Sequence, residues 1–192
     1  VDEAHLLLPP LVRIVDVAQL LDLAHPVSWN QSQLLTVHVV DGATAAYNIP
    51  MPMWLTGPLC AGSVRRALAA VVDRHTVLRT TYEVDTEGDY AQRVHASPIT
   101  GTLVREVCTL SQGDAAAEAV VVADASTSFD LMGGGRVLRC VLVCVDDARH
   151  LLLLNVHHVA FDGASAALLL GELGHLYVSL AAGGSVSDVM MP

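Results

Sequence analysis

Apolar residues recur at helical spacing in several segments of the chain. Between residues 58 and 75 the apolar side chains fall on one face of a helical wheel, and the charged side chains fall elsewhere. The apolar positions are Leu59, Val64, Leu68, Val71 and Val72. Residues 114–125 and 164–181 also predict helices, the second of which ends before two glycines. Ser28 has the character of an N-cap and predicts a helix that reaches about residue 39.

Other segments show the alternating or continuous apolar pattern of β-strands. They are residues 78–84, 90–94, 103–110, 136–145 and 151–156. Residues 49–55 alternate in the same way, but Pro50 and Pro52 predict an edge or irregular strand there. The run 151–156 is almost entirely apolar, which predicts a central strand covered on both faces. This mixture predicts an α/β (α+β) two-layer sandwich with a mixed, largely antiparallel sheet flanked by helices.

Length and charge narrow the class of protein. The chain has 192 residues, so we expect one domain or one lobe of a larger domain, with residues 1–25 as a lead-in segment and residues 183–192 as a linker-like tail. It carries 20 acidic and 10 basic residues, and the basic residues are scattered arginines. Binding to nucleic acid needs clustered positive charge, so we expect no such partner. We also expect no membrane span, and we expect a cytoplasmic location because acidic residues stand where a signal peptide would be basic.

The most informative segment runs from residue 151 to residue 165. A predicted strand ends in His157-His158, three residues follow, and Asp162-Gly163 precedes the last predicted helix. Neighbouring residues on a strand point to opposite faces, so one imidazole is expected to pack inside and the other to face a cavity. An imidazole with a pKa near 6.5 can act as a general base near neutral pH. A structural role for both rings is the alternative that the residues alone leave open.

The residues after the two histidines also leave two interpretations open. Asp162 either orients a histidine ring or pairs with an arginine and braces the turn. Gly163 permits a positive φ or a close approach of the backbone to a ligand. The helix that follows brings free backbone N–H groups and the positive end of its dipole near the same place.

The segment His157–Gly163 resembles the HHxxxDG motif of the condensation domains of nonribosomal peptide synthetases, in the chloramphenicol-acetyltransferase-like superfamily. Wax ester synthase/diacylglycerol acyltransferases carry the same motif. Further segments in the family's order are similar to its YNIP stretch, its RHxxLRT motif and its PFDL…GPLLR segment. They are residues 46–50, 74–80, 128–131 and 135–139. The resemblance covers residues 26–182 and implies the N-terminal lobe of a two-lobe domain.

The resemblance implies a role for each residue of the motif. His158 would be the catalytic histidine, and His157 would be structural, packed beneath the site. Asp162 would form a salt bridge with an arginine, for which Arg79 is the first choice and Arg74 the second. Breaking a buried pair from one side costs roughly 3–5 kcal/mol, so we expect Asp162→Ala to impair folding and His158→Ala to impair turnover alone. Gly163 would line the cavity near the reacting carbonyl.

The resemblance also implies substrates and partners. Condensation domains join an amine acceptor to a thioester donor, both carried on the phosphopantetheine arms of carrier-protein domains. We therefore expect no metal and no cofactor bound by this chain, and inactivity without the C-terminal lobe. A homodimer through an exposed apolar face is a further expectation. The alternatives are a non-catalytic half-domain that docks a carrier protein, and an O-acyltransferase that uses acyl-CoA.

The sequence departs from the family pattern in its first motif, SxAQxRLWxL. Ser28, Gln31 and Leu34 match this motif, whereas Gln33 and Leu35 stand where the family has arginine and tryptophan. These departures bear on substrate handling more than on fold. Relatives that form heterocycles carry DxxxxD in place of HHxxxDG, so the sequence disfavours heterocyclisation.

Overall fold

The computed structural model describes residues 21–42, 44–96, 103–108 and 113–189. The main sheet has four strands in the order β2-β7-β6-β5, and β7 is antiparallel to both of its neighbours, whereas β5 is parallel to β6. Its strands are β2 (Asn48–Thr56), β5 (Val104–Cys108), β6 (Leu138–Cys144) and β7 (Arg149–His157). A smaller antiparallel sheet has the order β1-β4-β3. Its strands are β1 (Ala24–Pro26), β3 (Thr80–Val84) and β4 (Tyr90–Val94).

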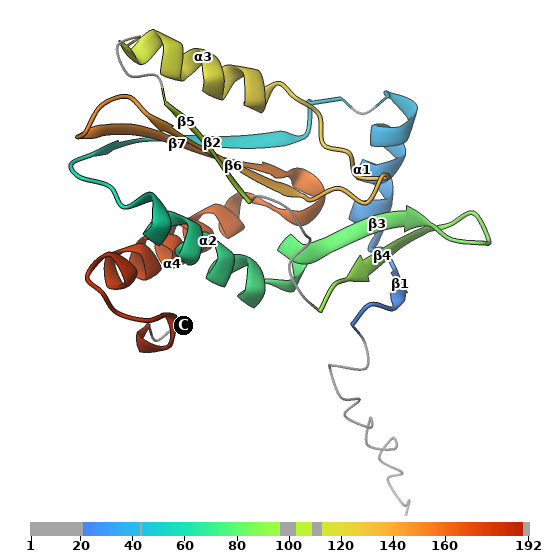
Figure 1. Cartoon of the computed structure of the whole chain (residues 1–192). Coiled ribbons are helices and arrows are strands. Elements are labelled where there is room, and N and C mark those ends of the chain that lie inside the picture. Colours follow the sequence, from blue (N-terminus) through green and yellow to red (C-terminus); the bar gives the residue numbers. More distant parts are fainter. Residues whose placement is uncertain (1–20, 43, 97–102, 109–112, 190–192) are drawn as a thin grey trace, which may run out of the picture.

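Helices cover both faces of the main sheet. The helices are α1 (Trp29–Val40), α2 (Ala61–Arg74), α3 (Gly113–Ala125) and α4 (Gly163–Ala181). In Figure 1, α3 lies on one face, α2 and α4 lie on the opposite face, and α1 lies with the small sheet at one end. The predicted α/β sandwich with a mixed sheet flanked by helices is confirmed, and α3 adds helical cover to the second face.

Strand β7 connects the two halves of the core. Leu151 and Leu153 belong to the apolar cluster that contains Ala117 and Val121 of α3. The intervening residues, Leu152, Leu154 and Val156, belong to the larger cluster that contains residues of α2 and α4. Because alternate side chains point to opposite faces, a strand buried on both faces must be apolar throughout. The predicted central, doubly covered strand is confirmed.

The predicted edge strand is also confirmed. β2 pairs only with β7 among the described strands, and Pro50 lies opposite Asn155 and Pro52 opposite Leu153 in that pairing. Proline has no N–H to donate to a second neighbour, so an outer position suits it. The strand is regular over nine residues despite its two prolines.

Several predicted boundaries are shifted by two or three residues, among them those of α2 and β3. α2 begins at Ala61 after an N-cap at Cys60, rather than at residue 58. β3 begins at Thr80, because the 3₁₀-helix η2 (Thr76–Arg79) occupies the start of the predicted strand. The Thr80 hydroxyl donates to the Thr76 carbonyl at 2.9 Å and helps to close this turn.

Helix α4 is long and apolar enough, by length and composition alone, to cross a membrane. In the structure it packs against α2 and buries Leu169, Leu173, Leu176 and Leu180. Glu172 is buried on the same helix and contacts Arg74 and His75. One face of α4 therefore packs in the core, whereas Leu168 and Val178 on the same helix are exposed.

Candidate functional site

His158 lies where β7 ends and the 3₁₀-helix η3 (His158–Ala160) begins, and its side chain is exposed. It lines an open groove of about 1080 Å³. One wall of the groove is α1, and the other is the turn from His158 to Asp162 with Ser165 of α4. Tyr47 and Val77 also line the groove. An imidazole in this position can meet a substrate, as the sequence predicts for one ring of the pair.

The backbone of His158 is fixed from two sides. Its N–H donates to the Tyr47 carbonyl at 2.9 Å, and its carbonyl accepts from the Phe161 N–H at 3.3 Å. The first bond ties the residue to the segment that leads into β2, and the second closes η3. An exposed ring is thus held on a rigid corner of the fold.

His157 has the opposite environment, with 0% of its surface exposed. Its Nδ1 accepts a hydrogen bond from the Val159 N–H at 3.1 Å, and its own N–H donates to the Val137 carbonyl at 2.9 Å. Desolvation, with smaller contributions from His38 and His158, lowers the pKa of His157 to about 4. The ring is therefore neutral near pH 7 and packs beneath the site.

Three aromatic side chains surround the His157 ring. His38 and Phe129 lie edge-on to it, with ring centroids 5.6 Å and 5.8 Å away, and Tyr47 is tilted at 6.3 Å. They come from α1, from the segment after α3 and from the segment before β2. Elements that lie far apart in the sequence thus meet under the motif.

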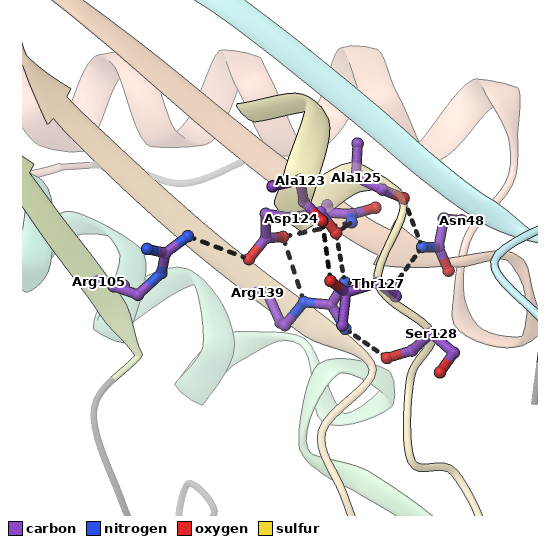
Figure 2. Close-up of polar contacts among 9 residues, drawn as sticks. Asn48, Arg105, Ala123, Asp124, Ala125, Thr127, Ser128 and Arg139 are labelled. Carbon is purple, nitrogen blue, oxygen red and sulfur yellow. Dashed lines mark hydrogen bonds and ion pairs between the residues drawn. The ribbon is translucent and has the colours of Figure 1, made fainter. Parts of the chain in front are cut away.

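Hydrogen bonds from Arg139 hold the segment that carries Phe129 in place. Figure 2 shows Arg139 of β6 directed at the end of α3 and the segment that follows it, where its guanidinium donates to carbonyl oxygens of Asp124, Thr127 and Ser128 at 2.7–3.0 Å. The same guanidinium lies 3.9 Å from the centroid of the Phe129 ring. The Asp124 carboxylate accepts from Arg139 and forms an ion pair with Arg105. The resemblance to PFDL…GPLLR therefore marks a structural clamp beneath the two histidines.

The predicted ion pair between Asp162 and Arg79 is wrong. Asp162 is exposed and is the N-cap of α4, where its carboxylate accepts from the Ser165 N–H at 2.9 Å and the Ser165 hydroxyl at 2.6 Å. These hydrogen bonds hold the pKa of Asp162 below its usual range. Arg79 is buried on η2 and donates to the His95 carbonyl instead. Asp162 braces the turn by capping a helix, because the free N–H groups of α4 lie closer to it than Arg79 does.

Arg74, the second predicted partner of Asp162, contacts a residue that the sequence analysis missed. Glu172 of α4 is 4% exposed, its Oε1 lies 3.3 Å from Arg74 Nε, and its Oε2 lies 2.6 Å from His75 Nε2. The first two residues of the RHxxLRT-like segment thus join α2 to α4. A carboxylate between Leu169, Leu173 and Leu176 on an apolar helical face is the sequence signal that points to it.

Gly163 is the first residue of α4 and is exposed. A Cβ built on it meets no described atom within 4 Å. The described part of the lobe therefore leaves room for a side chain, and any crowding must come from a substrate or from atoms outside it. That Gly163 lines the cavity near a reacting carbonyl stays a prediction.

The described residues contain no group of three or more histidine, cysteine, aspartate or glutamate side chains arranged to hold a metal ion. His157 is buried with one nitrogen engaged, and His158 is exposed beside Asp162, which is bound to Ser165. The polar side chains that line the groove are the His158 imidazole, the Asp162 carboxylate, the hydroxyls of Ser165 and Tyr47, and the uncharged polar groups along α1.

Comparison with known proteins gives a consistent picture. A family profile described as "Condensation domain" matches residues 24–192. The chain is 35% identical over 153 residues to tyrocidine synthase 2 of Brevibacillus parabrevis, and 34% identical over 159 residues to chondramide synthase cmdD of Chondromyces crocatus. These matches cover 80% and 82% of this chain, but only 4% of each relative.

Solved structures agree on the fold. The starter condensation domain of rhizomide synthetase RzmA superposes with a TM-score of 0.77 at 22% identity, covering 85% of this chain and 39% of that chain. The first condensation domain of the calcium-dependent antibiotic synthetase, in complex with substrate analogue 2a, gives a TM-score of 0.75 at 25% identity and covers the same shares. The chain thus spans about two fifths of these structures.

Proposed function

Because this chain belongs to the condensation-domain family, we propose that it forms the N-terminal lobe of a domain that makes amide bonds in nonribosomal peptide synthesis. The donor would be an acyl thioester and the acceptor an amine, each on the phosphopantetheine arm of a carrier domain. The observation that carries the proposal is the position of His158, exposed in the groove on a corner held by two backbone hydrogen bonds.

The proposed reaction follows from the chemistry of an imidazole beside an amine and a thioester. The amine nitrogen attacks the thioester carbonyl carbon, the C–N bond forms, and the C–S bond then breaks to release the thiol of the donor arm. His158 either takes a proton from the amine and returns it to the leaving thiolate, or positions the amine and stabilises charge in the tetrahedral intermediate. General-base catalysis contributes about 10²–10⁴-fold, and orientation of two tethered substrates contributes at least as much.

We infer a different supporting role for each of the three residues His157, Asp162 and Arg79 around His158. His157 is neutral, so it adds no positive charge beside His158 when that ring is protonated. Asp162 caps α4 and holds the turn, and Arg79 fastens η2 to the end of the small sheet through the His95 carbonyl. These contacts support structural roles for all three.

The chain spans about two fifths of condensation-domain structures, so the rest of the active-site tunnel would come from a C-terminal lobe. We propose that the isolated lobe is inactive and that its partners are this second lobe and carrier-protein domains in the cytoplasm. Trp29 and Val77 are exposed on the walls of the groove, which supports cover by a second lobe.

The test joins this chain to the rest of its reading frame and supplies donor and acceptor carrier domains loaded with aminoacyl groups. Mass spectrometry of the acceptor arm should show an amide product, and His158→Ala should lower the rate at least about 100-fold. His175→Ala is the matched control, because His175 is exposed on α4 outside the groove. A full rate with His158→Ala would overturn the proposal.

The same assay separates the alternative functions. Carrier binding with no amide formed by the complete protein would indicate a docking module. Ester formation from acyl-CoA and an alcohol would indicate an O-acyltransferase.

A further inference from the structure

Two buried imidazoles meet beneath the proposed catalytic residue. His38 of α1 is 3% exposed and His157 of β7 is 0% exposed, and their ring planes meet at 88°. Nδ1 of His38 and Nε2 of His157 are both buried, and neither has a hydrogen-bond partner in the described part of the chain. An unpaired buried polar group costs about 1–3 kcal/mol, so two in adjacent rings call for an explanation.

The tautomer of His157 follows from its hydrogen bond. Nδ1 accepts the Val159 N–H and therefore carries no proton. Burial keeps the ring neutral near pH 7, so its one proton is on Nε2. The orphaned nitrogen of His157 is thus a donor that needs an acceptor.

His38 offers that acceptor. Desolvation lowers its pKa despite the opposing effect of Asp130, so it too is neutral near pH 7, and one of its nitrogens is a free acceptor. Two imidazoles joined by an N–H···N bond of ~3 Å have centres roughly 5–6 Å apart, since each nitrogen lies about a ring radius from its centre. The observed separation is 5.6 Å. In the structure neither nitrogen has a partner, and a rotation of the two rings would bring Nδ1 of His38 and Nε2 of His157 together.

We propose that His38 is a positioning residue whose Nδ1 accepts the Nε2–H of His157, fixing its tautomer and thereby the turn that carries His158. This inference rests on the proposed function of His158 and extends it to a residue outside the HHxxxDG motif.

The effect would reach His158 through the backbone of η3. In the other neutral tautomer, Nδ1 of His157 would carry the proton and could no longer accept from the Val159 N–H. Val159 directly follows His158, so this loss would loosen the first turn after the proposed catalytic residue. Contacts between α1 and η3 place His38 and the turn in the same packing unit.

The experiment reads the tautomer directly in the chain labelled with ¹⁵N-histidine. Two-bond proton–nitrogen NMR spectra of the unsubstituted chain should show His157 protonated on Nε2. His38→Leu should produce a mixture of tautomers and raise amide hydrogen exchange at Val159 at least about tenfold, with little change at Val156 in β7. His38→Asn should restore both, because its side-chain oxygen can accept where Nδ1 did.

His150→Leu is the matched control. His150 is also buried, on the opposite end of β7, and neither of its ring nitrogens has a described hydrogen-bond partner. Its replacement should leave the His157 tautomer unchanged. A His157 protonated on Nδ1 in the unsubstituted chain would overturn the proposal even if no variant folded.

Two further outcomes also decide it. An unchanged tautomer in folded His38→Leu, or a failure of His38→Asn to restore it, would count against the proposal. In the complete domain His38→Leu should lower kcat more than it changes KM. The NMR measurement of the His157 tautomer does not depend on turnover, so it tests the role of His38 independently of the proposed function.

Discussion

At the scale of single residues, the site contains two adjacent histidines with opposite environments, one buried and one exposed. His157 is buried beneath the site, where its pKa is lowered to about 4, and His158 lies in the groove. Strand alternation predicted that the two rings would differ. The partners of His157 could not be predicted, because they come from three separate elements that only the fold brings together.

The buried histidines make stability sensitive to mild acid. The folded-state pKa of His157 lies below the value of 6.5 expected in the unfolded chain, so below pH 6.5 the unfolded chain binds more protons. The free energy of unfolding should therefore fall as the pH drops from 7 to 5, by ~2 kcal/mol from His157 alone, and His38 should act in the same direction. Urea unfolding at both pH values measures this, with His175→Ala as a control that keeps the dependence. A flat profile would contradict the burial of a neutral His157.

The capping role of Asp162 predicts a modest cost for its removal. Asp162→Ala should lower the free energy of unfolding modestly, as expected for loss of an N-cap rather than of a buried ion pair. Ser28→Ala is the matched control, because Ser28 caps α1 with the same reciprocal geometry. Thermal or urea denaturation compares the two variants. A loss several times larger for Asp162→Ala than for Ser28→Ala would restore the ion-pair interpretation.

At the scale of elements, periodicity predicted the helices and the central strand, because burial on one or both faces leaves a direct pattern in the sequence. The two prolines of β2 predicted an edge strand because proline has no N–H to donate to a second neighbouring strand. The 3₁₀ turn at Thr76–Arg79 was not predictable, because Val77 and Leu78 fit a strand equally well. The ion pair between Arg74 of α2 and Glu172 of α4 joins residues about 100 positions apart, and the periodicity of the sequence carries no information about such a contact.

The contacts of Glu172 with Arg74 and His75 predict that this residue contributes to the stability of the fold. Glu172→Leu should lower the free energy of unfolding by ~2 kcal/mol, because a hydrogen bond to His75 and an ion pair with Arg74 are lost while both partners keep access to water. Arg74→Ala with His75→Ala should cost more, since it leaves a buried carboxylate without its described partners. Urea denaturation ranks the variants. The reverse order would contradict the stabilising role assigned to Arg74 and His75.

At the scale of the whole molecule, we propose that this chain forms one wall of a larger structure. Its groove is open, and the family's solved structures are more than twice as long as the matched region. Large apolar side chains are exposed on α1 and α4, among them Trp29, Val40 and Val178. The resemblance of the motifs predicted the lobe and its fold, but a sequence cannot show what covers the groove.

We propose that the exposed apolar surface also allows the isolated lobe to pair with itself. Sedimentation velocity should show a shift from monomer to dimer as protein concentration rises, and Trp29→Ser should weaken it, because Trp29 is 77% exposed. Val122→Ser on α3, which also replaces an exposed apolar residue, is the control that should leave the shift unchanged. A monomer at all concentrations would contradict this pairing.

The central claim is that His158 acts on substrates while the rest of its corner only holds it. The most direct measurement is single-turnover amide formation by the complete domain, made alongside thermal unfolding, for the unsubstituted protein and for His158→Ala. The account predicts a rate at least about 100-fold lower with an unchanged melting temperature. An undiminished rate, or a collapse of the melting temperature that explains the loss, would contradict it.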